Sequence, residues 1–123
     1  MIESQVVAIV ERALQSQQWF YINVHGSTFG ISGMPDIVTL DDTGRFVAIE
    51  CKAPGKSPAI NQLRRAIEIC KANGRYIIAY EDFALADILA NTLPTQTIGS
   101  EIGESEFEWK SEQSHQTFEI ILK

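Results

Sequence analysis

The fold of this chain is decided by the stretch GMPDIVTLDDTGRFVAIECK, which spans residues 33–52. Its β-branched and apolar residues at 37–40 and 45–49 predict two strands. Residues 41–44 between them (DDTG) have the composition of a turn, in which the glycine can adopt a positive φ. We therefore expect a tight antiparallel β-hairpin.

Two carboxylates are expected to meet across this hairpin. Asp36, at the start of the first strand, should lie opposite Ile49 or Glu50, with Cβ atoms roughly 4.5–5.5 Å apart. Because side chains alternate along a strand, Glu50 and Lys52 should share a face, and Cys51 should point away. A register slip of one residue would separate the two carboxylates.

Neighbouring carboxylates repel each other, which raises a pKa unless a cation lies between them. Mg²⁺ or Mn²⁺ would resolve this conflict, because such ions take oxygen ligands from one or two carboxylates and from substrate phosphates. The ion can acidify a water and stabilise displacement at phosphorus, and Lys52 would orient that water or stabilise the developing charge. The alternative is a pair of surface acids beside a salt-bridging lysine, since such short patterns recur by chance.

The wider motif extends this pattern. It consists of GMPD at 33–36, thirteen intervening residues, ECKAPGKSP at 50–58, and then Gln62. It resembles the PD-(D/E)xK nuclease superfamily, and within it the virus-type replication-repair nuclease (VRR-NUC) family and its Holliday-junction-resolving relatives. The resemblance covers about residues 3–80.

The resemblance implies a role for individual residues. Asp36 and Glu50 would be metal ligands, with the backbone carbonyl of Cys51 as a third. Lys52 would be the catalytic lysine, and Gln62 a helix residue that supports the site. Glu3 also belongs to the implied catalytic set, and Glu11 on the same helix is the alternative to it. A structural alternative is that Glu3 stabilises the helix dipole.

The resemblance also implies a fold and an activity. The fold would be α/β and restriction-endonuclease-like, a central mixed β-sheet flanked by helices, with a C-terminal strand pair or extension. Residues 1–94 would form the nuclease core. The resemblance does not cover residues 95–123, whose sequence pattern predicts a polar loop and strands, in the same domain or at a dimer contact. The activity would be a metal-dependent endonuclease, acting as a homodimer on branched or flap DNA in replication, repair or recombination.

Periodicity and turn residues predict the remaining elements. They are a helix at 3–18, a strand at 19–24, a loop at 25–35, a helix from Ser57 (N-cap) and Pro58 to Gly74, a strand at 75–80, a helix at 83–93 capped by Asp82, a polar loop at 95–106, and strands at 107–109 and 117–122.

The loop at 25–35 contains three glycines and precedes Asp36 directly. Its backbone N–H groups and hydroxyls, including those at Ser32 and Gly33, could follow a nucleic-acid backbone. A plain connection is the alternative. His25 is expected either at the edge of the site or as a hydrogen-bonded surface histidine.

The net charge of −6 argues against a general nucleic-acid binder. Residues 52–75, however, carry a local charge of +5. Within this basic band we expect Lys56, Arg64 and Arg65 to contact DNA. A solvated helix face is the alternative.

Several classes are excluded or disfavoured. No run approaches the roughly 18 apolar residues of a membrane span, and no signal peptide precedes the first helix, so no membrane partner is expected. Two cysteines without CxxC spacing predict a reduced, cytoplasmic compartment and make zinc unfavourable. The GKS at 55–57 does not form a phosphate-cradling loop, because Glu50 stands where a glycine is required, so no nucleotide cofactor is expected. The main alternative function is a non-catalytic DNA-binding or assembly module on the same fold.

Overall fold

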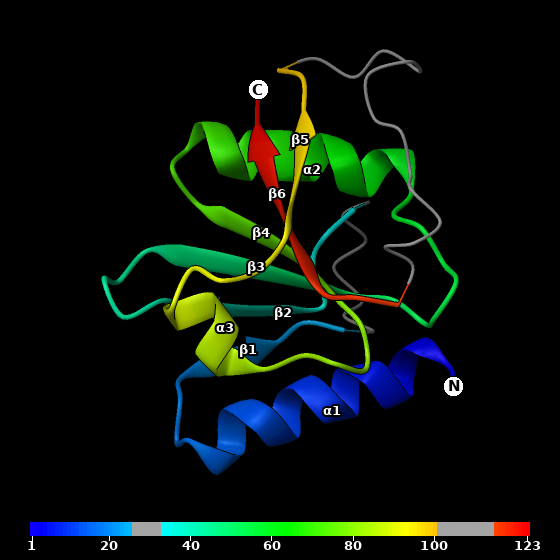
Figure 1. Ribbon diagram of the computed structural model, residues 1–123, viewed down its shortest axis with the longest axis vertical. Helices are drawn as coiled ribbons and strands as arrows, with labels where there is room; N and C mark the ends of the chain where they lie inside the picture. Colours follow the sequence, from blue (N-terminus) through cyan, green and yellow to red (C-terminus); the bar gives the residue numbers. More distant parts are fainter. Residues whose placement is uncertain (26–32, 101–114) are drawn as a thin grey trace.

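A mixed β-sheet forms the centre of the molecule, and helices cover both of its faces (Figure 1). The computed structural model describes residues 1–25, 33–100 and 115–123. In these residues the elements are α1 (Glu3–Ser16), β1 (Tyr21–Asn23), β2 (Ile37–Leu40), β3 (Phe46–Cys51), α2 (Ile60–Lys71), β4 (Arg75–Ala79), α3 (Leu85–Leu89), β5 (Thr95–Ile98) and β6 (Phe118–Leu122). The sheet has six strands in the order β1-β2-β3-β4-β6-β5. The predicted α/β class, a mixed sheet flanked by helices, is confirmed.

The pairing of the strands explains the mixed character of the sheet. β1, β2 and β3 form an antiparallel meander, whereas β3 and β4 are parallel neighbours joined through α2. β6 lies antiparallel to β4 and parallel to β5. This arrangement is consistent with a fold of the restriction-endonuclease type.

Each face of the sheet has its own apolar core. On one face, Val6, Val10 and Leu14 of α1 pack with buried residues of α3 and the central strands. On the other face, Leu63 and Ile67 of α2 pack against β4 and β6. All five residues of β4 are buried, as expected for a strand covered on both sides.

The start of α2 differs from the prediction. The helix begins at Ile60 with Ala59 at its N-cap, and not at Ser57 and Pro58. The reason is the side chain of Gln62, whose Oε1 accepts a hydrogen bond of 2.8 Å from the backbone N–H of Ala59. This bond pairs the N–H of the N-cap residue itself with the side chain three residues later, as in one half of a capping box.

The end of α2 is formed by Asn73, which adopts a left-handed φ of 67°. The backbone N–H of the next residue, Gly74, donates to the Ile69 carbonyl at 2.8 Å, which completes a Schellman turn. The predicted terminator, Gly74, is therefore one position late. It is needed instead for space, because a Cβ there would lie 2.7 Å from Cγ2 of Ile69.

The predicted helix at 83–93 is only the short α3, and Asp82 does not cap it. Asp82 Oδ1 accepts hydrogen bonds from the backbone N–H and the hydroxyl of Thr117, at 2.9 and 2.6 Å. This aspartate therefore fixes the chain just before β6. The prediction was wrong because the partner lies 35 residues away in the sequence.

The predicted polar loop at 95–106 is wrong in its first part, because Thr95–Ile98 forms β5. Its residues alternate between exposed and buried, and the strand pairs with β6 along its whole length. The strand predicted at 107–109 lies outside the described residues. Among the helices that are described, none has the length and apolar content to cross a membrane.

Arg75 is almost fully buried, with 2% of its surface exposed. Its guanidinium binds Glu119 at 2.7 and 3.0 Å, Asp41 at 3.4 Å, and the carbonyl of Ile88 at 2.9 Å. These hydrogen bonds raise the pKa of Arg75 and join the β2–β3 turn, α3 and β6. Arg75 therefore does not belong to the predicted basic band.

Candidate active site

The hairpin holds its two carboxylates in the expected register. Ile37 pairs with Ile49, which places Asp36 across from Glu50 at the end of the hairpin. Oδ2 of Asp36 accepts a hydrogen bond of 2.8 Å from the backbone N–H of Cys51. The carboxylate of Asp36 is thereby fixed at the carboxyl end of β3.

Lys52 follows β3 directly and lies on the same side as Glu50, as strand alternation predicts. Its Nζ is 4.0 Å from Oε1 of Glu50 and 3.9 Å from Oε1 of Glu3. The backbone N–H of Lys52 donates to the Ala79 carbonyl at 2.9 Å, which fixes the start of the side chain. The structure thus brings one ammonium between two carboxylates.

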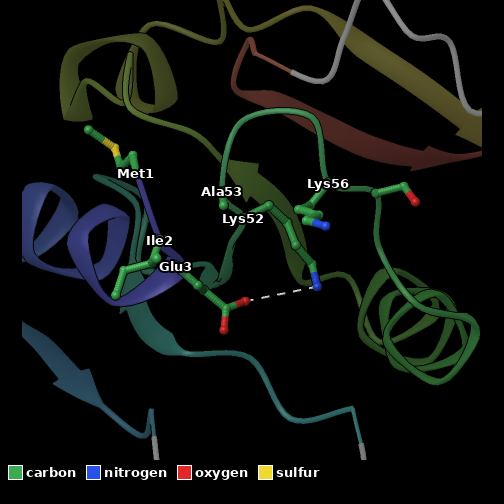
Figure 2. A pocket seen from close by; sticks show the side chains of 7 residues that line it. Met1, Ile2, Glu3, Lys52, Ala53 and Lys56 are labelled. Atoms are coloured by element: carbon green, nitrogen blue, oxygen red, sulfur yellow. Dashed lines mark ion pairs between the residues drawn. The ribbon is translucent and has the colours of Figure 1, made fainter.

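Glu3, and not Glu11, is the glutamate of α1 that reaches the site. Figure 2 shows the Glu3 carboxylate directed toward the ammonium of Lys52. Glu11 turns instead toward β1, where its oxygens accept hydrogen bonds from the Tyr21 hydroxyl at 3.0 Å and from Asn23 Nδ2 at 2.8 Å. The sequence left this choice open because both glutamates lie on one helix.

Gln62 connects the first turn of α2 to the buried carboxylate. Its Nε2 donates to Oε1 of Glu50 at 2.8 Å, while its Oε1 accepts from the N–H of Ala59. The amide orientation follows from these two bonds, since only a donor can face the carboxylate. Gln62 therefore lies where a supporting residue was predicted.

His25, which the sequence placed either at the edge of the site or on the surface as a hydrogen-bonded histidine, lies in the site. Its Nδ1 lies 2.5 Å from Oδ1 of Asp36. The pairing of β1 with β2 accounts for this contact. β1 runs antiparallel to β2, so the residues just after β1 must meet Asp36, and Val24 already donates to the carbonyl of that residue at 2.8 Å.

Burial and like charge act together on Glu50. Only 2% of its surface is exposed, and its Oε2 has no hydrogen-bond partner among the described residues. Burial first, and then the nearby charge of Asp36, raise the pKa of Glu50 to about 9. Burial and Asp36 also raise the pKa of Glu3, against the opposing effect of Lys52. The site therefore has an excess of negative charge that its own lysine does not neutralise.

The donor set fits a hard divalent cation. Glu3, His25 and Asp36 each offer one ligand atom, and these atoms lie within 4.8 Å of one another. Exposed acids often gather without an ion, so the stronger observation is the buried, unpartnered oxygen of Glu50. Carboxylate oxygens suit Mg²⁺ and Mn²⁺. Asp36 belongs both to this group and to the predicted ligand pair with Glu50.

The residues predicted to contact DNA differ in their exposure and in whether an acidic residue pairs with them. Lys56 and Arg64 are exposed, with Lys56 near the site in the loop before α2. Arg65 is half-buried and its Nη1 lies 2.6 Å from Oε2 of Glu68, which offsets its charge. Ser32 lies outside the described residues.

Gly33 has a packing role next to the site. It adopts a φ of +78°, and a Cβ added there would lie 2.4 Å from the carbonyl oxygen of Asn61 and 3.3 Å from the backbone N of Gln62. The loop before Asp36 thus lies directly on the first turn of α2. Glycine is required here for both conformation and space.

We expect Gly33→Ala to lower the free energy of unfolding by about 2 kcal/mol or more, and to displace Gln62. Gly44→Ala is the matched control, because Gly44 also has a positive φ, +82°, but its added Cβ meets nothing within 4 Å. Urea denaturation of both variants measures the difference. Equal losses of stability would show that contact with α2 is unimportant.

Comparisons of this chain with models of known protein families, with curated proteins and with solved structures find no match.

Proposed function

We propose that this chain is a divalent-metal-dependent nuclease that hydrolyses phosphodiester bonds in DNA. The observation that carries the proposal is the buried Oε2 of Glu50, which has no hydrogen-bond donor among the described residues and lies in a carboxyl group next to Asp36. The other oxygen, Oε1, lies 4.0 Å from the ammonium of Lys52. A buried carboxylate oxygen without a donor is costly unless the group takes up a proton or binds a cation, and a cation retains the charge that the chemistry needs.

In this proposal Asp36 and Glu50, with the backbone carbonyl of Cys51, hold Mg²⁺ or Mn²⁺. When bound, the ion supplies a Lewis acid that binds phosphate oxygens and lowers the pKa of a water. Glu3 lies at the exposed side of the site, where it can accept a hydrogen bond from a water.

The other residues position these groups or stabilise charge. Lys52 places an ammonium where negative charge develops on the phosphate, in a largely buried position in which electrostatic stabilisation is strong. Gln62 fixes Glu50, and His25 fixes Asp36. Lys56 and Arg64 are exposed and can hold the DNA backbone beside the site.

The resemblance to the VRR-NUC family is part of the same proposal. It favours endonucleolytic cleavage of branched or flap-bearing DNA in replication, repair or recombination, in the cytoplasm. Homodimerisation also stays a prediction, which light scattering at working concentration checks. A monomeric mass together with full activity would contradict it.

Metal dependence is the direct test. We expect cleavage of a panel of fluorescently labelled DNA forms (single-stranded, duplex, flap and four-way junction) in Mg²⁺ or Mn²⁺, and no cleavage after chelation. Gel electrophoresis of the products measures both. The proposed site requires this result because its carboxylates cannot bind a phosphate without an intervening cation.

Asp36→Asn, tested alongside, should also abolish cleavage, because it removes one of the proposed metal-ligand charges. Asp87→Asn, on α3, is the matched control and should retain activity. Cleavage that survives both chelation and the Asp36→Asn change would refute the proposal.

A further inference from the structure

A cavity of about 430 Å³ opens beside the site, between the start of α1 and the loop that follows Lys52 (Figure 2). Glu3 and Lys52 belong both to the site and to the lining of this cavity. Ile2, Ala53, Lys56 and Ser57 also line it. A ligand in the cavity would therefore adjoin the proposed scissile phosphate.

Ile2 is the unusual residue of this lining. It is the N-cap of α1, a position that favours serine, threonine, aspartate or asparagine, and it makes no side-chain capping bond. It also contributes little to the core, since 65% of its surface is exposed. An isoleucine that neither caps nor packs, next to a proposed active site, is available for contact with an apolar face of a ligand.

The other residues that line the cavity offer apolar, hydroxyl and cationic groups that can bind a nucleotide. Ala53 adds apolar surface, Ser57 a hydroxyl, and Lys56 an exposed cation that can neutralise a phosphate. The volume lies at the lower end of the range of about 300–1,000 Å³ typical of small-molecule sites. A cavity of this size suits one nucleotide but not a stacked base pair.

We propose that this cavity holds a single unstacked nucleotide of the DNA strand, immediately next to the phosphate that is cleaved. The inference rests on the proposed nuclease function and specifies its substrate. Ile2 and Ala53 contact the base or sugar without hydrogen bonds to base edges, so recognition tolerates any base but requires that the base leaves its stack. Unpaired nucleotides leave the stack most easily, so cleavage favours phosphates beside them.

Binding tests the cavity without cleavage. In the Asp36→Asn background, a duplex carrying 2-aminopurine at one unpaired position should change its fluorescence on binding, and a fully paired duplex should not. Adding Ile2→Ser should weaken binding of the unpaired duplex about fivefold and remove the fluorescence change. Serine is a better N-cap than isoleucine, so this variant should fold at least as well as its parent.

Ile121→Ser is the matched control, because Ile121 is 38% exposed on β6 and does not line the cavity. It should bind like its parent. Identical binding and fluorescence for the Ile2→Ser and Ile121→Ser variants would overturn the inference.

Cleavage separates this inference from the proposed function. With Mn²⁺, the wild-type protein should cleave beside the unpaired nucleotide about tenfold faster than in paired DNA, and Ile2→Ser should reduce this preference. Equal cleavage of both DNAs would overturn the inference and leave the nuclease proposal standing. With no cleavage in any metal the nuclease proposal fails, and the 2-aminopurine response alone then decides whether the cavity binds an unstacked nucleotide.

Discussion

Replacing Lys52 with methionine is expected to slow DNA cleavage about a thousand-fold, while the protein still folds and binds DNA. The ammonium lies 4.0 Å from Glu50 and 3.9 Å from Glu3, with only 13% of the side chain exposed. A positive charge in such a position stabilises negative charge on the phosphate far more than an exposed lysine can. Methionine retains the side chain as far as its fourth atom and removes the charged nitrogen.

Single-turnover cleavage with saturating protein measures this effect, and fluorescence anisotropy with the same DNA measures binding. Lys71→Met is the matched control, since Lys71 is exposed in the last turn of α2. A nuclease loses cleavage and retains binding in the Lys52 variant. A DNA-binding or assembly module would show no cleavage in the wild-type protein and similar binding in all three.

Replacing Glu50 with glutamine is expected to stabilise the metal-free protein at alkaline pH, by on the order of several kcal/mol. The pKa of Glu50 is raised from 4.5 to about 9 in the folded protein, so the unfolded chain loses this proton first as the pH rises. Between these values the folded state binds more protons than the unfolded state, and stability falls with rising pH. The loss of stability caused by ionising the buried Glu50 is absent below about pH 4.5 and is complete above about pH 9.

Glutamine at this position mimics the protonated acid at every pH. Its carbonyl can still accept the bond from Gln62, and its amide places a donor near Asp36. The variant should therefore match the wild-type protein near pH 4.5 and have a higher midpoint of thermal unfolding, by more than about 5 °C, at pH 8.5.

Thermal unfolding across this pH range, in chelator and in Mn²⁺, checks the prediction. Mn²⁺ should raise the midpoint of the wild-type protein and leave the variant nearly unchanged, because a ligand stabilises only the state that binds it. Glu81→Gln, at an exposed position, is the control and should show neither effect. A difference between the Glu50 variant and the wild-type protein that does not depend on pH would contradict the raised pKa.

The hairpin could be predicted from sequence because its signals are local. The turn at 41–44 and the two flanking strands lie within 20 residues, and their register follows from the turn. Asp36, Glu50 and Lys52 were placed together for this reason. Glu3 and Gln62 came from the resemblance, and the structure places both within reach of the same groups.

The errors arose where a contact that the local sequence pattern does not reveal, either with a remote strand or with a side chain in the same helix, overrides a local signal. Ser57 and Pro58 look like the start of a helix, but the side chain of Gln62 moves that start to Ile60. β5 looked like a loop because its burial depends on β6, about 20 residues further along the chain. His25 acquires its partner only when β1 pairs with β2.

The place of β6 in the sheet has a consequence for the synthesis of the protein. All proposed catalytic residues lie between positions 3 and 62, so they are synthesised before β6. Yet β4 lacks a neighbour on one side, and Arg75 lacks its closest counter-charge, until Glu119 has been made. At about 5–20 residues per second, several seconds separate the synthesis of the last of these residues from that of β6. We therefore expect the sheet that carries the proposed site to be completed only after β6 has been translated.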